Sequence, residues 1–576
     1  MKTPNTTINS ITSCCVALLI LLLGAILHAQ PMPQLGLISN SAQSFNGYTL
    51  FAPADFTTTY LIDNCGRIVK TWQSQYDPGQ SAYLLEDGSL FHTAKLTTNR
   101  TFSNTGGAGG RLERYDWNGT LLWGYDWSGT TFYQHHDAIV LPNGNVLLLS
   151  WDAKTREEAT AAGRRQYPQG GLWSDKIVEL RPVGKDSAVV VWEWKLWDHL
   201  VQDNDAAKAN YGAVSERPER LDVNFTNKTA IVSDWIHLNG LAYNAELDQI
   251  VVSSRELSEI YIIDHSTTTA EAASSRGGRQ GKGGDFLWRW GNPQAYKRGT
   301  AADRKLYGQH NPQWIARGLP GAGNILLFNN GDERPDGMYS TVEEIQTPVN
   351  ASGAYAVPTS TSATYAPSAS VWAYKAANAQ SFYSSKISGA QRLPNGNTLI
   401  CEGVKGNFFE VTPMGTTVWQ YRNPVGTNGP TAQGTQVMGQ NVFRCLRYAS
   451  TYAAFTGKTL TPGAPVELNP TQNSCVITTD VRQDNVHQEF REQTALTIAP
   501  NPASELIRVA LNLNIPTRVR LSVCNALGQD VMNVAPESVL GSMIRELSVA
   551  NLPQGTYFLR VQTDIQLFSA MFAVMR

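Results

Sequence analysis

The chain has 576 residues, a net charge of −2 and only 16% charged residues. This length is more than one compact core usually supports, so we expect more than one domain. The near-neutral charge argues against a nucleic-acid partner, because proteins that bind polyanions carry a basic excess. The 48 glycines, 15 tryptophans and 22 tyrosines favour an all-β protein with many short strands and tight turns.

Residues 1–29 have the features of a secretory signal peptide. Lys2 supplies a positive start, residues 16–27 form an apolar run that is short for a membrane span, and Ala29 is a small residue suited to cleavage. No other long apolar run follows. We therefore expect a secreted or cell-surface protein, exported through the periplasm, with no membrane span in its mature form.

The seven cysteines include two, Cys14 and Cys15, that would be removed with the signal peptide. The others show no spacing typical of a metal site, and export permits disulfides between them. They are Cys65, Cys401, Cys445, Cys475 and Cys524. A bond between Cys65 and Cys445 would join the first and last repeats described next, although sequence does not determine the pairing.

Two short elements alternate along residues 30–452. The first is an acidic residue followed by an apolar residue and a tryptophan, and its six copies end at Trp72, Trp123, Trp192, Trp288, Trp372 and Trp419. The second is a Leu-Pro-Asn-Gly-Asn turn, clearest at 141–145 and 393–397, whose Asn-Gly pair suits a tight hairpin. This alternation predicts a six-bladed β-propeller with tryptophan between the blades. The alternative is two unrelated β-sandwiches that share turn chemistry.

The repeat ends near residue 452. We expect residues 453–494 to be a linker and residues 495–576, where short alternating strands return, to be a small Ig-like β-sandwich. The segments Pro500-Asn501-Pro502-Ala503, Leu527-Gly528 and Leu552 to Tyr557 resemble the C-terminal sorting domain of the type IX secretion system. This resemblance implies the type IX secretion machinery as a partner and export across an outer membrane.

Three histidines occupy one equivalent position in successive repeats, just before the second element: His136, His237 and His310. The same position in the copy at Leu393 is Ser388. Equivalent positions in a propeller gather at one mouth of the channel, where imidazoles serve as nucleophile, acid–base group or anion donor. Three imidazoles could also bind a metal, or each could only satisfy backbone groups at the start of a strand.

The remaining histidines are weaker candidates for a site. Side chains alternate along a strand, so we expect His135 to point away from His136. We expect surface or structural roles for His92, His199, His265 and His487.

Polar residues near these histidines are candidates for binding a substrate. Arg255 follows the strand that begins at His237, and its guanidinium suits a planar oxyanion such as sulfate, phosphate or carboxylate. The alternative for Arg255 is a solvated or Asp-paired arginine. Arg334 is a second candidate of this kind. The asparagine candidates are Asn239, Asn311 and Asn407.

The segments Asp234-Trp-Ile-His237, Gln249 to Arg255, Gly308-Gln-His310 and Asn324 to Asp332 resemble the aryl-sulfate sulfotransferase family, over roughly Gly47 to Pro424. The resemblance implies an exported six-bladed propeller that moves a sulfuryl group between phenols through a channel histidine, without a nucleotide donor or other cofactor. His237 and His310 match channel histidines of that family. Asn407 stands where its nucleophilic histidine is expected, and Thr341 replaces an arginine. His136 then becomes the candidate replacement nucleophile or base.

These observations favour an arylsulfotransferase-like enzyme whose partner is a phenolic sulfate or another anionic ligand. The lost family residues favour a second interpretation, a non-catalytic propeller that binds a glycan, a peptide or a small anion. A quinone-dependent dehydrogenase would show more blades and a calcium-bound cofactor site. A metal-dependent hydrolase or lactonase stays open because histidines can hold a metal, although our leading interpretation includes none.

Overall fold

The computed structural model describes residues 34–102, 105–228, 232–471, 475, 496–525, 529–563 and 567–576. Strands dominate these residues and the helices are short, which confirms the all-β prediction. The expected signal peptide and His487 lie outside the described residues. No helix within the described ranges is long and apolar enough to cross a membrane.

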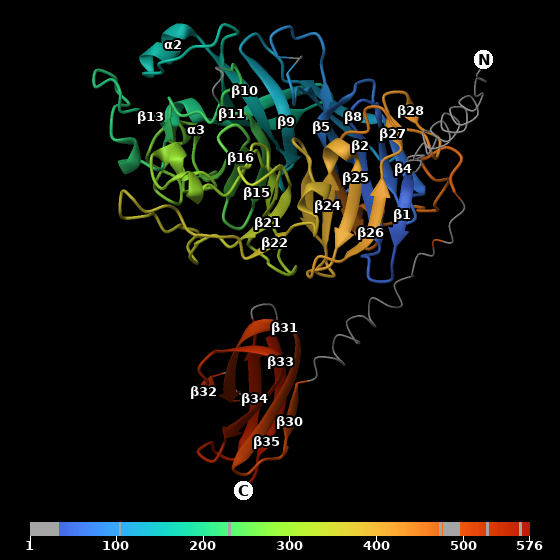
Figure 1. The fold of residues 1–576 in the computed structure, drawn as a ribbon, viewed down its shortest axis with the longest axis vertical. Coiled ribbons are helices and arrows are strands. Elements are labelled where there is room, and N and C mark those ends of the chain that lie inside the picture. The colour runs from blue at the N-terminus through green and yellow to red at the C-terminus, as the bar shows by residue number, and fades with distance from the viewer. Residues whose placement is uncertain are drawn as a thin grey trace, which may run out of the picture.

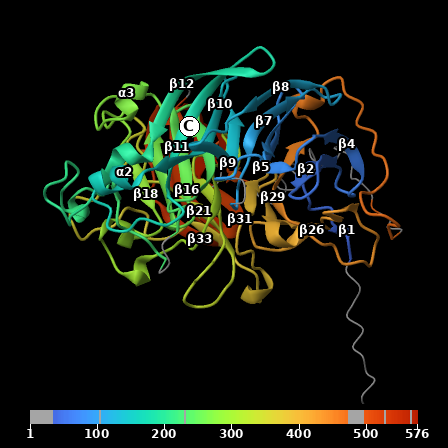
Figure 2. The same cartoon turned by 90° about the horizontal axis from the view of Figure 1, so that it is seen from above.

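Residues 36–449 form six antiparallel sheets in the described part of the chain (Figures 1 and 2). The first sheet has the order β29-β2-β3-β4, with bounds Val442–Ala449, Gly47–Pro53, Thr58–Ile62 and Ile68–Gln73. The second contains β5 to β8, with bounds Pro78–Leu84, Leu90–Lys95, Gly110–Tyr115 and Leu121–Asp126. The third contains β9 to β12, with bounds Phe132–Val140, Val146–Lys154, Leu172–Val183 and Ser187–Lys195.

The other three sheets follow the same order along the chain. The fourth contains β15 to β18, with bounds Leu238–Asn244, Gln249–Ser254, Glu259–Asp264 and Trp288–Trp290. The fifth contains β19 to β22, with bounds His310–Trp314, Ile325–Asn329, Thr341–Ile345 and Trp372–Tyr374. The sixth has the order β23-β24-β25-β26-β1, with bounds Gly389–Arg392, Thr398–Glu402, Asn407–Val411, Thr417–Arg422 and Gly36–Asn40.

Short elements connect these sheets. The pairs β13 with β14 and β27 with β28 have two residues in each strand, with bounds Leu200–Val201, Leu221–Asp222, Val425–Gly426 and Gly429–Pro430. Helices α2 (Arg156–Ala161) and α3 (Thr269–Ala272) each begin with a capping box, formed by Thr155 with Glu158 and by Thr268 with Glu271. Helix α3 lies in the connection between β17 and β18.

The first strands of the six sheets contact one another in a closed order. Strand β29 contacts β5, β5 contacts β9, β9 contacts β15, β15 contacts β19, β19 contacts β23, and β23 contacts β29. Both ends of this region complete sheets begun elsewhere in the chain, because β29 pairs with β2 while β1 pairs with β26. The ring is therefore closed twice by strands that are distant in sequence.

The repeated tryptophans join each sheet to the next. In each of the six sheets, the outermost strand that carries a tryptophan provides an indole Nε1 that donates to a main-chain oxygen of the following sheet. The six distances are 2.8–3.0 Å. The pairs are Trp72 with Asp116, Trp123 with Ser187, Trp194 with Gly284, Trp288 with Ala366, Trp372 with Pro413 and Trp419 with Asn64. In the third sheet this tryptophan is Trp194 and not the Trp192 expected from the repeat, because Trp192 donates to the Thr267 hydroxyl. A buried indole needs a partner for its N–H, and here the partner is the neighbouring repeat.

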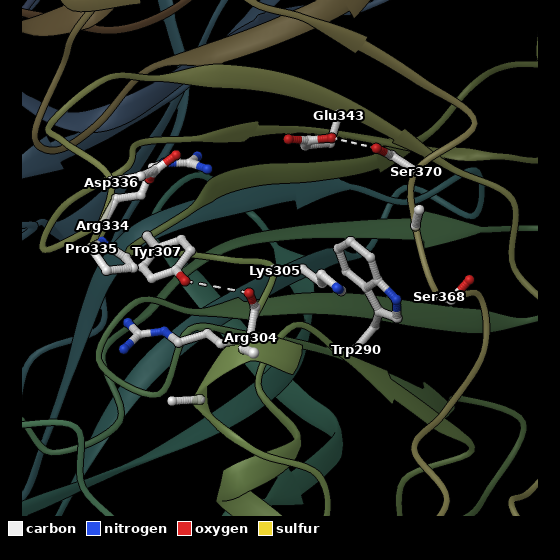
Figure 3. Close-up of a pocket in the computed structure, with 13 residues that line it drawn as sticks. Trp290, Arg304, Lys305, Tyr307, Arg334, Pro335, Asp336, Glu343, Ser368 and Ser370 are labelled. Carbon is white, nitrogen blue, oxygen red and sulfur yellow. Dashed lines mark hydrogen bonds between the residues drawn. The ribbon is translucent and has the colours of Figure 1, made fainter.

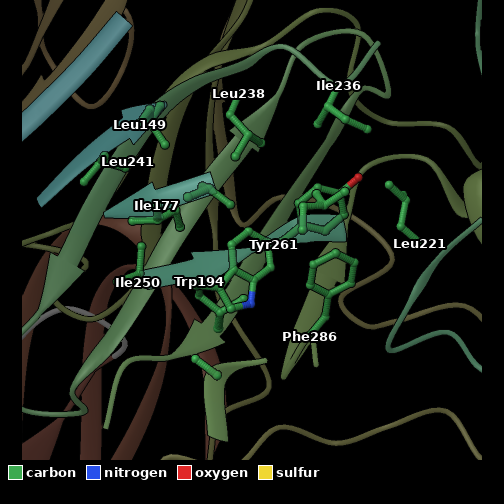
Figure 4. Close-up of a cluster of buried hydrophobic side chains, with 14 of the residues drawn as sticks. Leu149, Ile177, Trp194, Leu221, Ile236, Leu238, Leu241, Ile250, Tyr261 and Phe286 are labelled. Atoms are coloured by element: carbon green, nitrogen blue, oxygen red, sulfur yellow. The ribbon is translucent and has the colours of Figure 1, made fainter. Parts of the chain in front are cut away.

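Large apolar side chains fill the space between neighbouring sheets. Figure 4 shows one such cluster, in which Trp194, Tyr261 and Phe286 pack with aliphatic residues of the third and fourth sheets. Tyr261 and Phe286 stack with ring centroids 4.3 Å apart. Complete burial of a side chain of this size contributes about 1.5–3 kcal/mol, so these clusters stabilise the contacts between sheets that position the inner strands.

A disulfide joins Cys65 to Cys475, with Cα atoms 5.7 Å apart. The pairing of Cys65 with Cys445 that the sequence left open is therefore wrong, because Cys445 is a buried free thiol on β29. The segment 453–471, which the sequence assigns to a linker, packs on the first sheets: Phe455 is buried, and Arg67 forms a β-bridge with Pro465. This packing brings Cys475 to the turn that carries Cys65.

The C-terminal residues form a second β unit around their own apolar core. Its strands are β30 to β35, with bounds Thr497–Ala499, Leu506–Asn525, Asp530–Asn533, Glu537–Ser548, Gly555–Gln562 and Leu567–Val574. The long strand β31 pairs with β30 and β33 in its first part and with β32 and β34 in its last part. The buried side chains of Val509, Leu521, Leu559 and Phe572 belong to one cluster.

Candidate active site

The three equivalent histidines lie on the first strands of successive sheets. His136 is within β9, His237 directly precedes β15, and His310 begins β19. The ring centroids of His136 and His237 are 4.6 Å apart. His310 is close enough that protonation of one ring would oppose protonation of the other. The structure thus brings the three imidazoles together inside the ring of strands.

The main chain has an unusual conformation at two of these histidines. His136 and His237 have φ values of 51° and 54°, which are uncommon for a residue with a Cβ, although histidine tolerates them better than most. At His136 this turn interrupts the alternation of side chains along β9. The expectation that His135 points away from His136 is therefore wrong: the two Nδ1 atoms are 3.0 Å apart.

His237 is held by Asp234, three residues earlier. Its Nδ1 donates a 2.6 Å hydrogen bond to Oδ2 of Asp234, whose Oδ1 accepts a 3.1 Å bond from the Trp151 indole. Burial acts to raise the pKa of Asp234, but the charge of His237 and its hydrogen bond lower it overall. In the neutral form of the ring with its proton on Nδ1, Nε2 carries the lone pair. No described residue donates a hydrogen bond to Nε2, and the side chain is 15% exposed.

Both ring nitrogens of His310 are occupied. Nδ1 donates to Oδ1 of Asn330 at 2.7 Å, and Nε2 accepts the main-chain N–H of Ile387 at 3.1 Å. Burial lowers the pKa of His310 well below its ordinary value, and the charge of Arg255 adds to this effect. His310 is a neutral, fixed imidazole, so either attack or metal binding would first break one of these bonds.

His136 is also neutral, and it is more deeply buried than His237. Burial lowers the pKa of His136 well below its ordinary value, with further contributions from His237 and His135. Gly107 covers the ring: a Cβ at that position would come within 1.9 Å of Cε1 of His136. Behind His136, Nε2 of His135 lies 2.8 Å from Oδ1 of Asp175.

Four residues that the sequence analysis did not select take part in this site: Asp234, His135, Asp175 and Asn330. Asp234 carried a signal, because a carboxylate three residues before a candidate catalytic histidine can orient it. Asp175 and Asn330 carried none. They come from β11 and from the end of β20, and only the folded sheets bring them to the histidines.

Arg255 lies beside the histidines, but its charge is already paired. Its Nη2 is 2.8 Å from Oδ2 of Asp332, and its Nη1 bonds Glu256. The carboxylate-paired arginine, the alternative that the sequence left open, is thus the arrangement in the structure. Its side chain is 18% exposed, so a ligand could compete with Asp332 for the guanidinium.

The asparagine candidates make contacts within the protein. Asn239 donates to the main-chain oxygen of Gln309 at 2.8 Å, and Oδ1 of Asn311 accepts the N–H of Ala390 at 3.2 Å, so both link neighbouring sheets. Asn407 donates to Glu402 at 3.1 Å and accepts from Gln420 at 2.9 Å. Its amide is therefore engaged on both sides.

Arg334 lies in a different pocket of about 360 Å³ (Figure 3). Its guanidinium carbon is 5.0 Å from the centre of the Tyr307 ring, and Arg304 lies 4.5 Å from the same ring. Its Nη2 donates to Oγ1 of Thr341 at 3.3 Å. Arg334 is therefore not grouped with Arg255, which lines a smaller neighbouring pocket.

A buried ion pair between Arg444 and Asp137 joins two of the inner strands next to the histidines. Nη2 of Arg444 on β29 is 2.7 Å from Oδ2 of Asp137 on β9, and Nη1 bonds the hydroxyl of Tyr83 on β5 at 2.6 Å. Oδ1 of Asp137 also accepts from Tyr83 at 2.8 Å. Because Asp137 directly follows His136, this network fixes the strand that carries the histidine.

No group of three or more His, Cys, Asp or Glu side chains arranged to hold a metal ion occurs within the described ranges. The other described histidines are paired with acids. His92 contacts Glu113, His199 contacts Asp285, and His265 contacts both Glu179 and Asp248.

Two family models match the sequence. One, described as arylsulfotransferase (ASST), matches residues 34–430, and the other, described as a secretion system C-terminal sorting domain, matches residues 497–573. The second match identifies the tail as a signal for the type IX secretion machinery and the protein as exported, secreted or displayed on the cell surface. No curated protein sequence matches the chain.

Several solved structures are similar at low identity. A protein of unknown function from Bacteroides caccae is 12% identical, covers 70% of this chain and 99% of its own, and gives a TM-score of 0.38. A periplasmic gluconolactonase from Pseudomonas aeruginosa is 10% identical, with coverages of 88% and 100% and a TM-score of 0.34. A streptogramin B lyase is 10% identical, with coverages of 62% and 72% and a TM-score of 0.29. Likeness at this level carries no conclusion about activity.

Proposed function

This chain belongs to the arylsulfotransferase family, and from that membership we propose that it is an exported enzyme that transfers a sulfuryl group from a phenolic sulfate ester to a phenol. The observation that carries the proposal is the Asp234–His237 pair. It presents an imidazole nitrogen with a lone pair, backed by a carboxylate and next to a second neutral imidazole.

The proposed architecture follows the repeat. Residues 1–29 are a signal peptide, 30–452 a six-bladed β-propeller, 453–494 a connecting segment and 495–576 an Ig-like β-sandwich that serves as the sorting domain. The closed order of the inner strands and the six tryptophan bonds between sheets support the blade count.

In the proposed reaction Nε2 of His237 attacks the sulfur of the donor. The new N–S bond forms as the S–O bond to the donor phenol breaks, so the phenolate leaves with the bonding electrons. The ring of His237 becomes a sulfo-imidazolium, whose positive charge Asp234 stabilises through the 2.6 Å bond at Nδ1. An acceptor phenol then attacks the same sulfur and regenerates His237.

This assignment moves the nucleophile from His136 to His237. Nδ1 of His237 faces the carboxylate of Asp234, which can stabilise a sulfo-imidazolium, whereas Nδ1 of His136 faces the neutral imidazole of His135, which cannot. His136 is then the acid–base partner of the reaction. His310 is a neutral group that supports the site, and Arg255 binds a sulfuryl oxygen when the ligand displaces Asp332.

The second candidate is a propeller that binds an anionic ligand, such as a glycan, without turnover. It is favoured by the pairing of Arg255 with Asp332 and Glu256, which leaves little free positive charge for a developing anion. A binding protein would hold a phenolic sulfate reversibly and release it unchanged.

The test uses the purified exported chain with 4-nitrophenyl sulfate, with and without phenol. Nitrophenol release that depends on phenol, together with the appearance of phenyl sulfate, is the expected result. Saturable binding of the donor with no release over hours would favour the binding protein. His237→Gln is the matched variant, because glutamine retains a polar side chain but cannot carry a transferable sulfuryl group.

A further inference from the structure

A line of buried titratable groups leads away from the proposed nucleophile. Oδ1 of Asp175 on β11 lies 2.8 Å from Nε2 of His135 on β9. Nδ1 of His135 lies 3.0 Å from Nδ1 of His136. The ring of His136 meets that of His237 with centroids 4.6 Å apart, at an angle of 70°. An acid and two imidazoles thus end at the ring of His237, which would attack the substrate.

The inner part of this line is shielded from water. Asp175 and His135 have no exposed surface, and His136 is 3% exposed. The Trp151 ring stacks on His135 with centroids 4.4 Å apart. Neither Nε2 of His135 nor Oδ1 of Asp175 makes a well-aligned hydrogen bond within the described residues, and their mutual approach is bent. The Leu238 main chain also lies within reach of both groups.

The resting line holds its protons on neutral groups. Burial raises the pKa of Asp175 well above its ordinary value, and the neighbouring Asp234 adds to this. Burial lowers the pKa of His135 to about 3 and keeps His136 neutral as well. Two neutral imidazoles whose Nδ1 atoms face each other at 3.0 Å share one proton at that contact, because one nitrogen must donate and the other accept.

We propose that Asp175, His135 and His136 form a proton relay that protonates the phenolate leaving group during sulfuryl transfer. The inference rests on the proposed function and deepens it. His136 is the catalytic acid that touches the substrate. Asp175 and His135 act through it and are positioning residues that supply the proton.

The protons balance in the first half-reaction. Nε2–H of His136 gives its proton to the departing phenolate oxygen as the S–O bond breaks. Nδ1 of His136 takes the proton of His135 Nδ1, and Nε2 of His135 takes the proton of Asp175. Both imidazoles stay neutral and exchange tautomers, while Asp175 becomes a carboxylate.

The second half-reaction returns the proton. The acceptor phenol gives its O–H proton to Nε2 of His136 as its oxygen attacks the sulfur on His237, and the relay runs back to Asp175. The groups around the relay favour this return. Asp234 and Asp152 oppose a charge on Asp175, while His237, His310 and Arg255 oppose a positive charge on His136. The carboxylate of Asp175 is thus a short-lived state.

The choice of sulfuryl donor distinguishes proton supply by the relay from a purely structural role of its residues. Nitrophenolate is stable as an anion and leaves without a proton, whereas unsubstituted phenolate needs one. We would measure, for wild type and Asp175→Asn, the single-turnover rate at which the donor phenol is released from 4-nitrophenyl sulfate and from phenyl sulfate, with enzyme in excess and no acceptor present. General acid catalysis is worth roughly 10²–10⁴-fold. We expect a loss of that order with phenyl sulfate and less than about threefold with 4-nitrophenyl sulfate.

Two further variants serve as a second test of the relay and as its control. His135→Phe retains the stacking on Trp151 but cannot pass a proton, so it should show the same loss with phenyl sulfate alone. His92→Phe is the control, because it changes a buried histidine that pairs with an acid, Glu113, outside the line, and it should leave the ratio of the two donors unchanged. Equal losses with both donors in Asp175→Asn and His135→Phe, or no loss with either, would overturn the relay. A wild type inactive on both donors would instead overturn the proposed function.

Discussion

The indole Nε1 of Trp419 donates a 2.8 Å hydrogen bond to the main-chain oxygen of Asn64, which lies 355 residues earlier in the sequence. The other five bonds of this kind each join a sheet to the one that follows it. The bond from Trp419 joins the sixth sheet to the first, so it lies where the chain closes its ring. The indole is fully buried, with the guanidinium of Arg447 4.1 Å from the ring centre.

Trp419→Phe removes this donor and leaves the Asn64 carbonyl without its partner. An unsatisfied buried polar group costs about 1–3 kcal/mol, and we expect the free energy of unfolding in urea to fall by that order. Trp372→Phe is the control, because its bond to Pro413 is solvent-exposed and water can replace it. Equal losses in the two variants would contradict the cost assigned here to leaving a buried carbonyl without a partner.

Asp234→Asn tests the orientation of His237. An amide at this position can donate to Nδ1 and so favours the tautomer with the proton on Nε2, which has no lone pair for attack. Replacing the acid behind a catalytic histidine costs roughly 10⁴-fold in kcat in a comparable triad, and we expect a loss of 10²–10⁴-fold with KM little changed. The thermal midpoint serves as the folding control. Undiminished turnover would remove Asp234–His237 from the mechanism.

The disulfide makes a chemical prediction. Digestion of the exported chain under non-reducing conditions should yield a cross-linked peptide with Cys65 and Cys475, and Cys445 should react with a thiol reagent only after unfolding. Cys65→Ser should lower stability by about 2–5 kcal/mol, the range for loss of a native disulfide. A peptide linking Cys65 to Cys445 would contradict the structure.

The low pKa of His310, caused first by burial, predicts how stability depends on pH. Below about pH 6.5 the unfolded chain binds a proton at this residue and the native state does not, so its contribution to stability falls as the pH falls. His135 and His136 act in the same direction. Asp175 acts in the opposite direction, because its raised pKa keeps a proton on the native state that the unfolded chain has lost.

His310→Asn isolates one contribution. Asparagine can still donate toward Asn330 but does not titrate. Between pH 7 and pH 5 the variant should lose less stability than wild type, by at most about 2 kcal/mol, from 1.36 kcal/mol for each pH unit below 6.5. Denaturation curves at the two pH values measure this difference. A parallel decline in both proteins would mean that His310 is protonated in the native state.

Much of the architecture can be read from the sequence, because its signals are local. A glycine-containing turn needs only its own residues, and a tryptophan recurring in each repeat marks a surface that must be covered. The all-β class, the alternating elements and the sorting tail follow from such signals. Five of the six tryptophans could be listed from the sequence, with Trp192 chosen in place of Trp194, but their partners, such as Asn64 for Trp419, could not.

The sequence by itself determined the β class, the repeat, the family and the position of three histidines in equivalent repeats. Only the tertiary structure decided what those imidazoles can do. His237 keeps a lone pair on Nε2 because its Nδ1 donates to Asp234. Both ring nitrogens of His310 are bonded, one to Asn330 and one to Ile387. His135 lies against His136 because the main chain turns at His136. The reason is physical: protonation and nucleophilicity depend on burial and on the partner of each ring nitrogen, and those partners come from strands far apart in the chain.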